Sequence, residues 1–299
     1  MHVPFREGID WVGCVDFSVR DFHGYEADRG TTYNVYLVRG ERTALIDTVK
    51  SPMADALLRN IAELVALERI DYVVCNHAEP DHAGGLPEVV ARTRPEAVFT
   101  STRGVEALQL HFHERAPELR PLADGQTLPL GNMTLTAMET RLCHWPESMV
   151  CWLGDRGVLF SQDVCGLHLA SHERFDDELP LELLDEEAAK YFANILMPLT
   201  TFVAREIDRL AKANLPIRLL APDHGPVRRK HIGRIIEQYA RWARQERTNK
   251  AVVLYSTMWG GTDLMARAVG EGLAAGGARV RLMPTSGSHR SEVATELLD

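Results

Sequence analysis

The stretch His77-Ala78-Glu79-Pro80-Asp81-His82 places four side chains that can bind metal ions within six residues. It closely follows Tyr72-Val73-Val74-Cys75, a short apolar run that is typical of a buried strand. Active sites of α/β proteins form where polar residues follow the end of a strand, because the strand fixes where the loop starts. The simpler alternative is a polar surface loop that is capped by Pro80 and turned by Gly84 and Gly85.

Three further potential ligands each follow a predicted strand: His144, Asp163 and His224. The strands that precede them are expected at residues 133–138, 158–161 and 218–221. Any one of these residues alone is more often a satisfied core or loop residue than a ligand. Their joint order after the histidine-rich loop favours a metal site.

In this order the residues resemble the ligands of the metallo-β-lactamase superfamily, which arrive as a His-rich loop, a lone His, a bridging Asp and a final His. The hydrolases of that superfamily carry His-x-His-x-Asp-His, whereas this chain has Glu79 in the second position. His-x-Glu-x-Asp-His is the version seen in flavodiiron proteins. The resemblance covers essentially the whole chain, including Gly24-Tyr25, Thr31-Thr32-Tyr33-Asn34 and Tyr191-Phe192-Ala193-Asn194-Ile195-Leu196.

The resemblance implies two non-haem iron ions per chain. The implied ligands are His77, Glu79 and His144 for one iron, Asp81, His82 and His224 for the other, and Asp163 as the bridge between them. The residue types agree with iron, because a carboxylate in place of an imidazole favours a harder ion that reaches Fe(III) over zinc. Coordination positions that the protein leaves open are typical of a catalytic site.

Other polar residues are expected to support the iron pair. The second ring nitrogen of a metal-bound histidine needs a partner, which Asp47, Asp223 or backbone carbonyls could supply. His23, His168 and Tyr191 are candidates for donating a proton or hydrogen bond to bound oxygen or nitrogen oxide. Tyr191 could equally be a core aromatic residue, and His168 a surface residue.

Residues 1–248 alternate predicted strands with predicted helices. The segment Thr32 to Val38 has an alternating pattern and continues through Gly40-Glu41 into Thr43 to Asp47, which predicts a hairpin. Helices are expected at residues 54–67, 104–111, 184–196, 202–213 and 229–245. This mixture favours two sheets covered by helices on their outer faces. The resemblance gives the same fold class, α/β, as a metallo-β-lactamase-like αββα sandwich that forms the diiron domain.

After the charged stretch 241–250, Ala251 to Tyr255 is an apolar strand of parallel-sheet character, so a domain boundary is expected near residue 248. Small and hydroxyl residues then precede a predicted helix, an arrangement that suits a phosphate group, although an ordinary strand-to-helix turn is the alternative. This loop resembles the FMN phosphate loop of flavodoxins, which implies that residues 249–299 begin a flavodoxin-like, doubly wound parallel sheet. The implied FMN-binding residues are Thr257, Met258, Trp259, Gly260, Gly261 and Thr262.

In a flavodoxin-like sheet, loops after later strands hold the flavin ring. Those strands lie beyond Asp299, so the chain is expected to be a fragment or the product of a truncated gene. We therefore expect this chain to bind FMN poorly or not at all, although its full-length parent binds it.

Composition excludes several classes of partner. The formal net charge of -9 gives no broad attraction to nucleic acid or to anionic membranes. No signal peptide and no apolar stretch of membrane-spanning length is evident, which predicts a cytoplasmic protein. The five cysteines form no Cys-x-x-Cys pair, so they are expected to be reduced and mostly buried.

The resemblance implies an oxidoreductase that reduces dioxygen to water, nitric oxide to nitrous oxide, or both. Electrons would reach the irons through FMN from an external donor, either rubredoxin-like or a flavin reductase. The resemblance also implies a head-to-tail homodimer or a dimer of dimers, in which the flavin of one subunit serves the irons of another. The alternatives are a dinuclear zinc hydrolase of the same fold and a gas or redox sensor without turnover.

Overall fold

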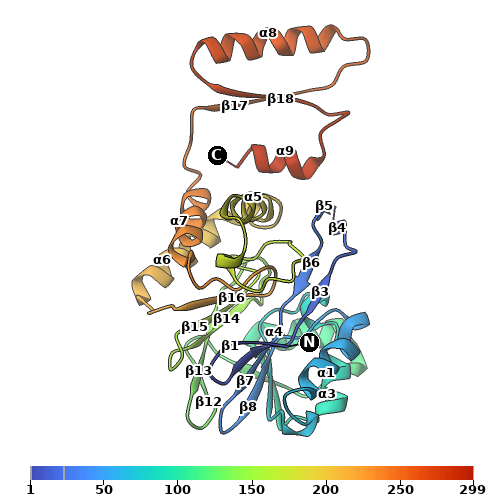
Figure 1. The fold of residues 1–299 in the computed structure, drawn as a ribbon, viewed down its shortest axis with the longest axis vertical. Coiled ribbons are helices and arrows are strands. Elements are labelled where there is room, and N and C mark those ends of the chain that lie inside the picture. The colour runs from blue at the N-terminus through green and yellow to red at the C-terminus, as the bar shows by residue number, and fades with distance from the viewer. Residues whose placement is uncertain (1, 23, 299) are drawn as a thin grey trace.

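Two β-sheets packed face to face form the centre of the chain in the computed structural model, which describes residues 2–22 and 24–298 (Figure 1). The first sheet has seven strands, in the order β1 (Val3–Arg6), β2 (Ile9–Trp11), β7 (Tyr36–Arg39), β8 (Thr43–Ile46), β9 (Tyr72–Cys75), β10 (Ala97–Ser101) and β11 (Leu119–Leu122). The second has five, in the order β12 (Thr127–Pro129), β13 (Thr134–Glu139), β14 (Met149–Leu153), β15 (Val158–Gln162) and β16 (Leu219–Pro222).

Alternating side chains of the central strands β8 and β9 face two different apolar layers. Ile46 and Val74 join the layer between the two sheets, whereas their neighbours Leu45 and Val73 face the helices outside the first sheet. Where both faces are covered, as in β9 and β14, the strand is apolar throughout rather than alternating with polar residues. Burying each such side chain contributes about 1.5–3 kcal/mol, which makes these layers the main source of stability.

Helices cover the outer face of each sheet. The first sheet is covered by α1 (Ala54–Ala62), α3 (Leu86–Thr93) and α4 (Thr102–Phe112), and the second by α5 (Leu181–Tyr191), α6 (Thr200–Ala213) and α7 (Ile232–Ala243). In α1 the buried residues Ala54, Leu57, Leu58 and Ile61 recur at helical spacing and form its apolar face. The resulting αββα order confirms the predicted fold class.

Short elements connect these layers. They comprise the strand pairs β3 (Cys14–Asp16) with β6 (Thr31–Tyr33) and β4 (Asp21–Phe22) with β5 (Tyr25–Glu26), the short helix α2 (Pro80–Ala83), the π-helical turn η5 (Phe192–Leu196), and the 3-10 turns η1 (Ser51–Met53), η2 (Leu67–Arg69), η3 (His113–Arg115), η4 (Asp176–Glu178) and η6 (Met197–Leu199).

The single strand predicted from Thr32 to Val38 is wrong, because the chain breaks at Asn34 and passes from β6 to β7. The predicted hairpin is nevertheless present as the antiparallel pair β7 and β8. Asn34 leaves the strand because its backbone N donates to Asp223 O (2.7 Å) and its side chain donates to Pro222 O (2.7 Å) and Gly225 O (2.8 Å). The break therefore anchors the loop that carries His224.

The helix predicted at residues 184–196 starts earlier, at Leu181, and changes form after Tyr191. Phe192–Leu196 makes a π-helical turn, a form that occurs often at functional sites. The spacing of apolar residues in a π-helical turn differs little from that in an α-helix, so the sequence does not predict this wider turn.

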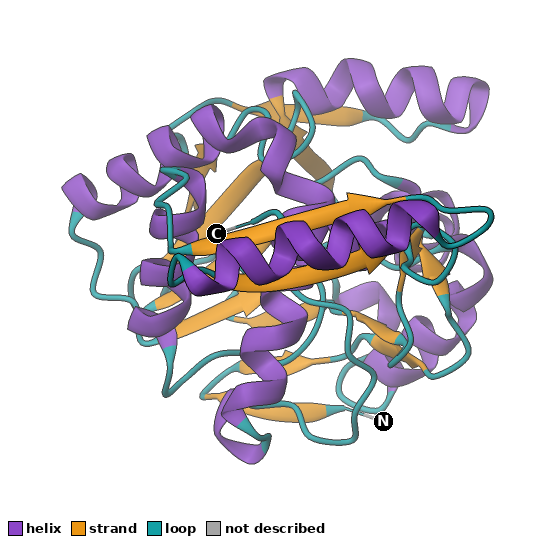
Figure 2. Cartoon of the chain, turned by 90° about the horizontal axis from the view of Figure 1, so that it is seen from above, coloured by secondary structure: helices purple, strands orange, loops and turns teal. Residues whose placement is uncertain are grey.

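The last part of the chain forms a separate parallel βαβ unit, with β17 (Lys250–Tyr255), α8 (Gly261–Ala275) and β18 (Arg279–Pro284). Figure 2 shows α8 lying along both strands. The following helix α9 (Arg290–Glu296) packs back on the rest of the chain, where Ser291 Oγ accepts a hydrogen bond from Glu26 N (2.9 Å) and Ser291 O accepts one from Asn194 Nδ2 (3.2 Å).

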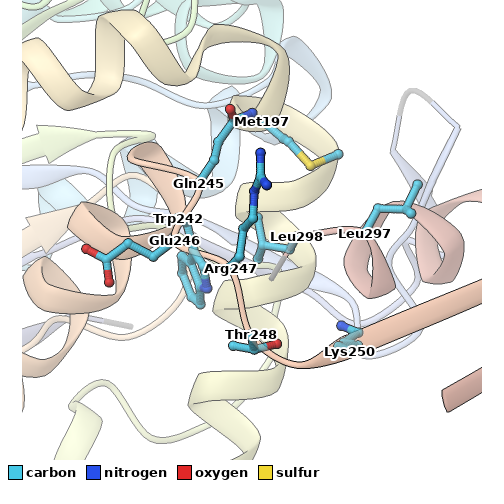
Figure 3. Close-up of a pocket in the computed structure, with 9 residues that line it drawn as sticks. All are labelled: Met197, Trp242, Gln245, Glu246, Arg247, Thr248, Lys250, Leu297 and Leu298. Atoms are coloured by element: carbon cyan, nitrogen blue, oxygen red, sulfur yellow. The ribbon is translucent and has the colours of Figure 1, made fainter. Parts of the chain in front are cut away.

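A hollow of about 330 Å³ lies where the βαβ unit joins the rest of the chain (Figure 3). It is lined by Met197, the end of α7, the connecting residues 245–248, Lys250 at the start of β17, and Leu297 and Leu298. Among the described residues, none of its lining side chains belongs to a group that could hold a metal ion.

Two further predictions can be compared with the described residues. All five cysteines are buried and none forms a disulfide, which agrees with the prediction of buried thiols. No helix within residues 2–22 and 24–298 is long and apolar enough to cross a membrane.

Candidate metal centre

The structure brings all seven predicted metal ligands together at one edge of the two sheets. His77 and His224 each lie two residues beyond a strand, β9 and β16 respectively, and Asp163 directly follows β15. Asp81 and His82 belong to the short helix α2, and the remaining two side chains are carried by loops. The apolar strands thus fix the starting point of each loop, and the polar residues follow where the strands end.

The first cluster consists of His77, Glu79 and His144. Glu79 Oε2 lies 3.2 Å from His77 Nε2 and 3.1 Å from His144 Nε2. Asp163 Oδ2 lies 3.4 Å and 3.0 Å from the same two nitrogens. Two carboxylate oxygens and two imidazole nitrogens therefore surround one point.

The second cluster consists of Asp81, His82 and His224. Asp81 Oδ2 lies 3.2 Å from His82 Nε2 and 3.1 Å from His224 Nε2. Asp163 Oδ1 lies 3.2 Å and 3.6 Å from these nitrogens. The two oxygens of Asp163 are thus divided between the clusters, which is the geometry of a carboxylate that bridges two cations.

Buried polar atoms without hydrogen-bond partners show that the site fits metal ions. Both carboxylate oxygens of Asp81, the Nε2 of His82 and Asp163 Oδ1 are buried and make no hydrogen bond. Leaving such atoms unsatisfied costs about 1–3 kcal/mol each, and more for charged groups. Cations between these nitrogen and oxygen donors would satisfy all of them, and the mixture of imidazole and carboxylate suits iron.

The electrostatics of the site show the same need for positive charge. Burial opposes ionisation of Asp163, yet His82, His144 and His77 hold its pKa well below the usual range. Burial likewise opposes protonation of His77, but contacts with Asp163, Glu147 and Glu79 raise its pKa well above the ordinary value. The carboxylates therefore demand cationic partners, which protons on histidine or metal ions can provide.

The outer nitrogens of three histidines have partners. Glu147 Oε1 lies 2.8 Å from His77 Nδ1, and the carbonyl of Thr32 accepts from His224 Nδ1 at 2.5 Å. Asp223 Oδ2 lies 3.5 Å from His82 Nδ1. Such contacts orient a ligating histidine and direct its Nε2 to the metal.

Asp223 and backbone carbonyls were among the partners expected from the sequence, but Asp47 is not one. Its carboxylate instead accepts hydrogen bonds from the backbone and side chain of Asn76 (2.6 and 2.7 Å), and burial raises its pKa to about 6. Glu147 was missed by the sequence analysis. The only signal was an acidic residue three positions after His144 in an otherwise apolar neighbourhood.

A pocket of about 340 Å³ leads to the clusters, and we call it the entrance pocket. Several ligand candidates from both clusters reach it, namely Glu79, His144, Asp163 and His224. Its other walls are Phe22, Trp145, His168, Tyr191, Asn194 and Ile195. Asn194 and Ile195 come from the π-helical turn, which thereby shapes the approach to the metals.

His168 and Tyr191 both line the entrance pocket, and His23 lies outside the described residues. His168 is buried, so the alternative that placed it on the surface is wrong. Its Nδ1 lies 2.9 Å from Thr31 Oγ1, whereas its Nε2 is buried without a hydrogen-bond partner. Tyr191 belongs to the apolar core as well as to the pocket.

The predicted phosphate loop, residues 257–262, connects β17 to α8. Gly260 N donates to Thr257 Oγ1 (3.0 Å), and Gly260 has a left-handed φ of 83° that favours glycine. Met258 and Trp259 are 83% and 92% exposed. The backbone at Gly260 and Gly261 is open to solvent beside the start of a 15-residue helix, which fits a phosphate group.

Comparison with known proteins agrees with this geometry. Residues 31–225 match the family described as ODP family beta lactamase. The chain is 40% identical to a nitric oxide reductase from Moorella thermoacetica, over 99% of this chain and 75% of that protein.

Solved structures are similar over the same extent. Rubredoxin oxygen:oxidoreductase from Desulfovibrio gigas has a TM-score of 0.97 and 39% identity, covering 100% of this chain and 75% of that one. The flavodiiron protein from Giardia intestinalis has a TM-score of 0.94 and 31% identity, covering 99% and 72%. With its metallo-β-lactamase-like fold and its clustered histidines and carboxylates, this chain belongs to the flavodiiron protein family.

Proposed function

We propose that this oxidoreductase reduces dioxygen to water, nitric oxide to nitrous oxide, or both, at a pair of iron ions that receive electrons through FMN. The observation that carries the proposal is the division of the two Asp163 oxygens between the two clusters. The relative from Moorella thermoacetica is a nitric oxide reductase, and the similar structure from Desulfovibrio gigas is an oxygen oxidoreductase. These names support both gases as substrates.

We assign the first cluster to one iron and the second cluster to the other, with Asp163 between them. When bound, the iron pair supplies two electrons and open coordination positions for a diatomic gas. Reduction of two nitric oxide molecules takes two electrons, whereas reduction of dioxygen to two waters takes four. The second case therefore needs a flavin that supplies two more.

The protein's own residues have three roles in this proposal. The contacts of Glu147, Asp223 and Thr32 O hold the ligand imidazoles in place, so that little rearrangement is needed when metals bind. His168 and Tyr191 face the entrance pocket and offer hydrogen bonds to a molecule held there. The apolar side chains of the pocket limit the access of water.

FMN is assigned to the loop 257–262, with its phosphate at the N-terminus of α8. We also propose the division into a diiron domain, residues 1–248, and a flavin-binding unit that starts at residue 249. The exposed Met258 and Trp259 within this loop suit a contact with a second subunit, as in a head-to-tail homodimer or a dimer of dimers. A rubredoxin-like protein or a flavin reductase is the proposed external donor, and the name of the Desulfovibrio gigas protein, rubredoxin oxygen:oxidoreductase, supports the former.

The two alternatives are less well supported. A dinuclear zinc hydrolase of the same fold is not favoured, because Glu79 replaces a nitrogen donor and the named relatives are oxidoreductases. A sensor without turnover is less well supported, because the relatives of similar sequence are named as a nitric oxide reductase and an oxygen oxidoreductase.

The test is a gas-reduction assay on protein produced with ample iron and reduced chemically in the absence of oxygen. Oxygen uptake is followed with an electrode, and nitrous oxide is measured by gas chromatography. Asp163→Asn is the matched variant, since it keeps the side-chain shape but removes the charge shared by both clusters. The proposal predicts consumption of at least one gas by the unaltered chain and little by the variant. Iron-loaded, reduced chain that consumes neither gas would refute it.

A further inference from the structure

A small apolar cavity lies behind the metal centre, within the layer between the second sheet and the helices α6 and α7. Its volume is about 30 Å³, and we call it the rear cavity. Its walls include Leu159 of β15 and the α6 residues Val203 and Ile207, all of which are buried. The rear cavity and the entrance pocket have no lining residue in common, so the two spaces are separate.

The rear cavity is lined by chain neighbours of two proposed ligands. Cys143 precedes His144, and Val164 follows Asp163, and both belong to the cavity wall. The two segments are tied together, because Gln162 Nε2 donates a hydrogen bond to Cys143 O. The metal-facing side chains and the cavity therefore lie along the same pair of segments, which form the partition between them.

Water is a poor occupant of the rear cavity. Ser161 Oγ donates to Val164 O (2.8 Å), and Glu206 pairs with Arg205 (3.0 Å), so these polar side chains are engaged elsewhere. Thr140 Oγ1 is buried without a hydrogen-bond partner and offers one hydroxyl to an occupant. A buried water requires two to four polar partners, whereas cavities with apolar walls stay dry and take up molecules such as xenon.

The size of the rear cavity suits a diatomic molecule. A water-sized sphere needs about 10–15 Å³ on this measure. A cavity of about 30 Å³ thus has room for roughly two such spheres, which corresponds to the two atoms of a diatomic gas. A larger organic ligand does not fit, and the one charged side chain in the wall, Glu206, is already paired with Arg205 and Arg209.

From these observations we propose that the rear cavity is a binding site for a nonpolar diatomic gas, which it stores next to the metal centre. The identity of the gas rests on the proposed function, and is dioxygen or nitric oxide. Gas that passes from the cavity to the metals has to cross the partition to which Cys143 and Val164 belong. The cavity raises the local gas concentration and thereby the rate at low gas supply.

Xenon is the probe, because its binding requires neither iron nor turnover. Crystals of the unaltered chain are placed under xenon pressure, and the same is done for Val203→Ile, which adds one carbon to the cavity wall. Val89→Ile is the matched control, since Val89 is also a fully buried valine on a helix but lies against the first sheet. Iron content, kcat and kcat/KM for each gas are measured for all three proteins.

The proposal predicts a xenon atom between α6 and β15 in the unaltered chain and in Val89→Ile, and none in Val203→Ile. It also predicts that Val203→Ile lowers kcat/KM for the gas several-fold, with kcat at saturating gas and iron content unchanged. Absence of xenon from the unaltered cavity, or an ordered water beside Thr140 in its place, would overturn the proposal. So would a kcat/KM in Val203→Ile that equals that of Val89→Ile. Xenon binding in an iron-loaded chain that reduces neither gas would instead refute the proposed function and leave the gas site standing.

Discussion

Replacing Glu147 by glutamine tests how the protein holds the first iron. Glu147 is 4% exposed, and its Oε1 accepts hydrogen bonds from His77 Nδ1 (2.8 Å) and Ala78 N (3.0 Å). Glutamine keeps the shape and one acceptor oxygen but has no negative charge. Both contacts therefore persist as ordinary hydrogen bonds rather than charged ones.

The size of the effect follows from these two contacts. A hydrogen bond to a charged group contributes about 1.5–3 kcal/mol and an ordinary one about 0.5–1.5 kcal/mol, so each contact loses roughly 1 kcal/mol. The sum of about 2 kcal/mol corresponds to a roughly 30-fold weaker affinity for the metal bound by His77. Removing the partner of a ligating histidine typically lowers metal affinity about 10–100-fold, which includes this value.

The assay is an anaerobic Fe(II) titration in competition with a chelator. Since Glu147 contacts only the first cluster, one of the two irons should leave the variant at a chelator concentration that leaves both in the unaltered chain. Glu187→Gln is the control, because Glu187 is 6% exposed and pairs with Arg29 (2.9 Å) rather than with a histidine of either cluster. Unchanged iron affinity in Glu147→Gln, or an equal loss in the control, would refute the reasoning.

Three further predictions follow from the same site. Glu79→His should shift metal preference from iron toward zinc and abolish gas reduction, because a neutral imidazole replaces a carboxylate. Retention of full iron content and activity would show that Glu79 does not select the metal. His144→Ala or Asp163→Ala should lose metal with little loss of fold, since the three apolar layers are buried whether or not metal is bound. Circular dichroism together with iron analysis tests this, and wholesale unfolding would mean that the metals are structural. A polypeptide of residues 1–299 should bind FMN weakly, because the loop 257–262 contacts the phosphate end alone; stoichiometric flavin absorbance after dialysis would contradict this.

The sequence predicts those parts of the site that depend on local patterns. The strands β9, β15 and β16 are short, largely apolar runs, each followed within two residues by a His or an Asp, and each appears where the pattern indicates it. Both faces of these strands are covered, so their apolar character is continuous and easy to recognise. The positions of six of the seven clustered residues follow from these strand ends, and His144 lies in the loop after β13.

Other parts of the site depend on contacts between distant segments, which leave little trace in the sequence. Glu147 reaches His77 across 70 positions in the chain, and the acceptor at Thr32 is a backbone carbonyl that any residue carries. Asn34 interrupts an alternating β-pattern because the loop after β16 offers carbonyl groups to its amide. Tertiary hydrogen bonds therefore override local β-propensity at this position.

The central claim is a pair of irons joined by Asp163, and Mössbauer spectroscopy of iron-57-loaded chain tests it most directly. Iron and protein analysis of the same sample counts the irons per chain, and the spectra report whether they are magnetically coupled. The account predicts two irons per chain, one for each cluster, which are coupled in the unaltered protein and uncoupled or depleted in Asp163→Asn. Two zinc ions with no iron after growth in iron-replete medium, or two irons that show no coupling, would contradict it.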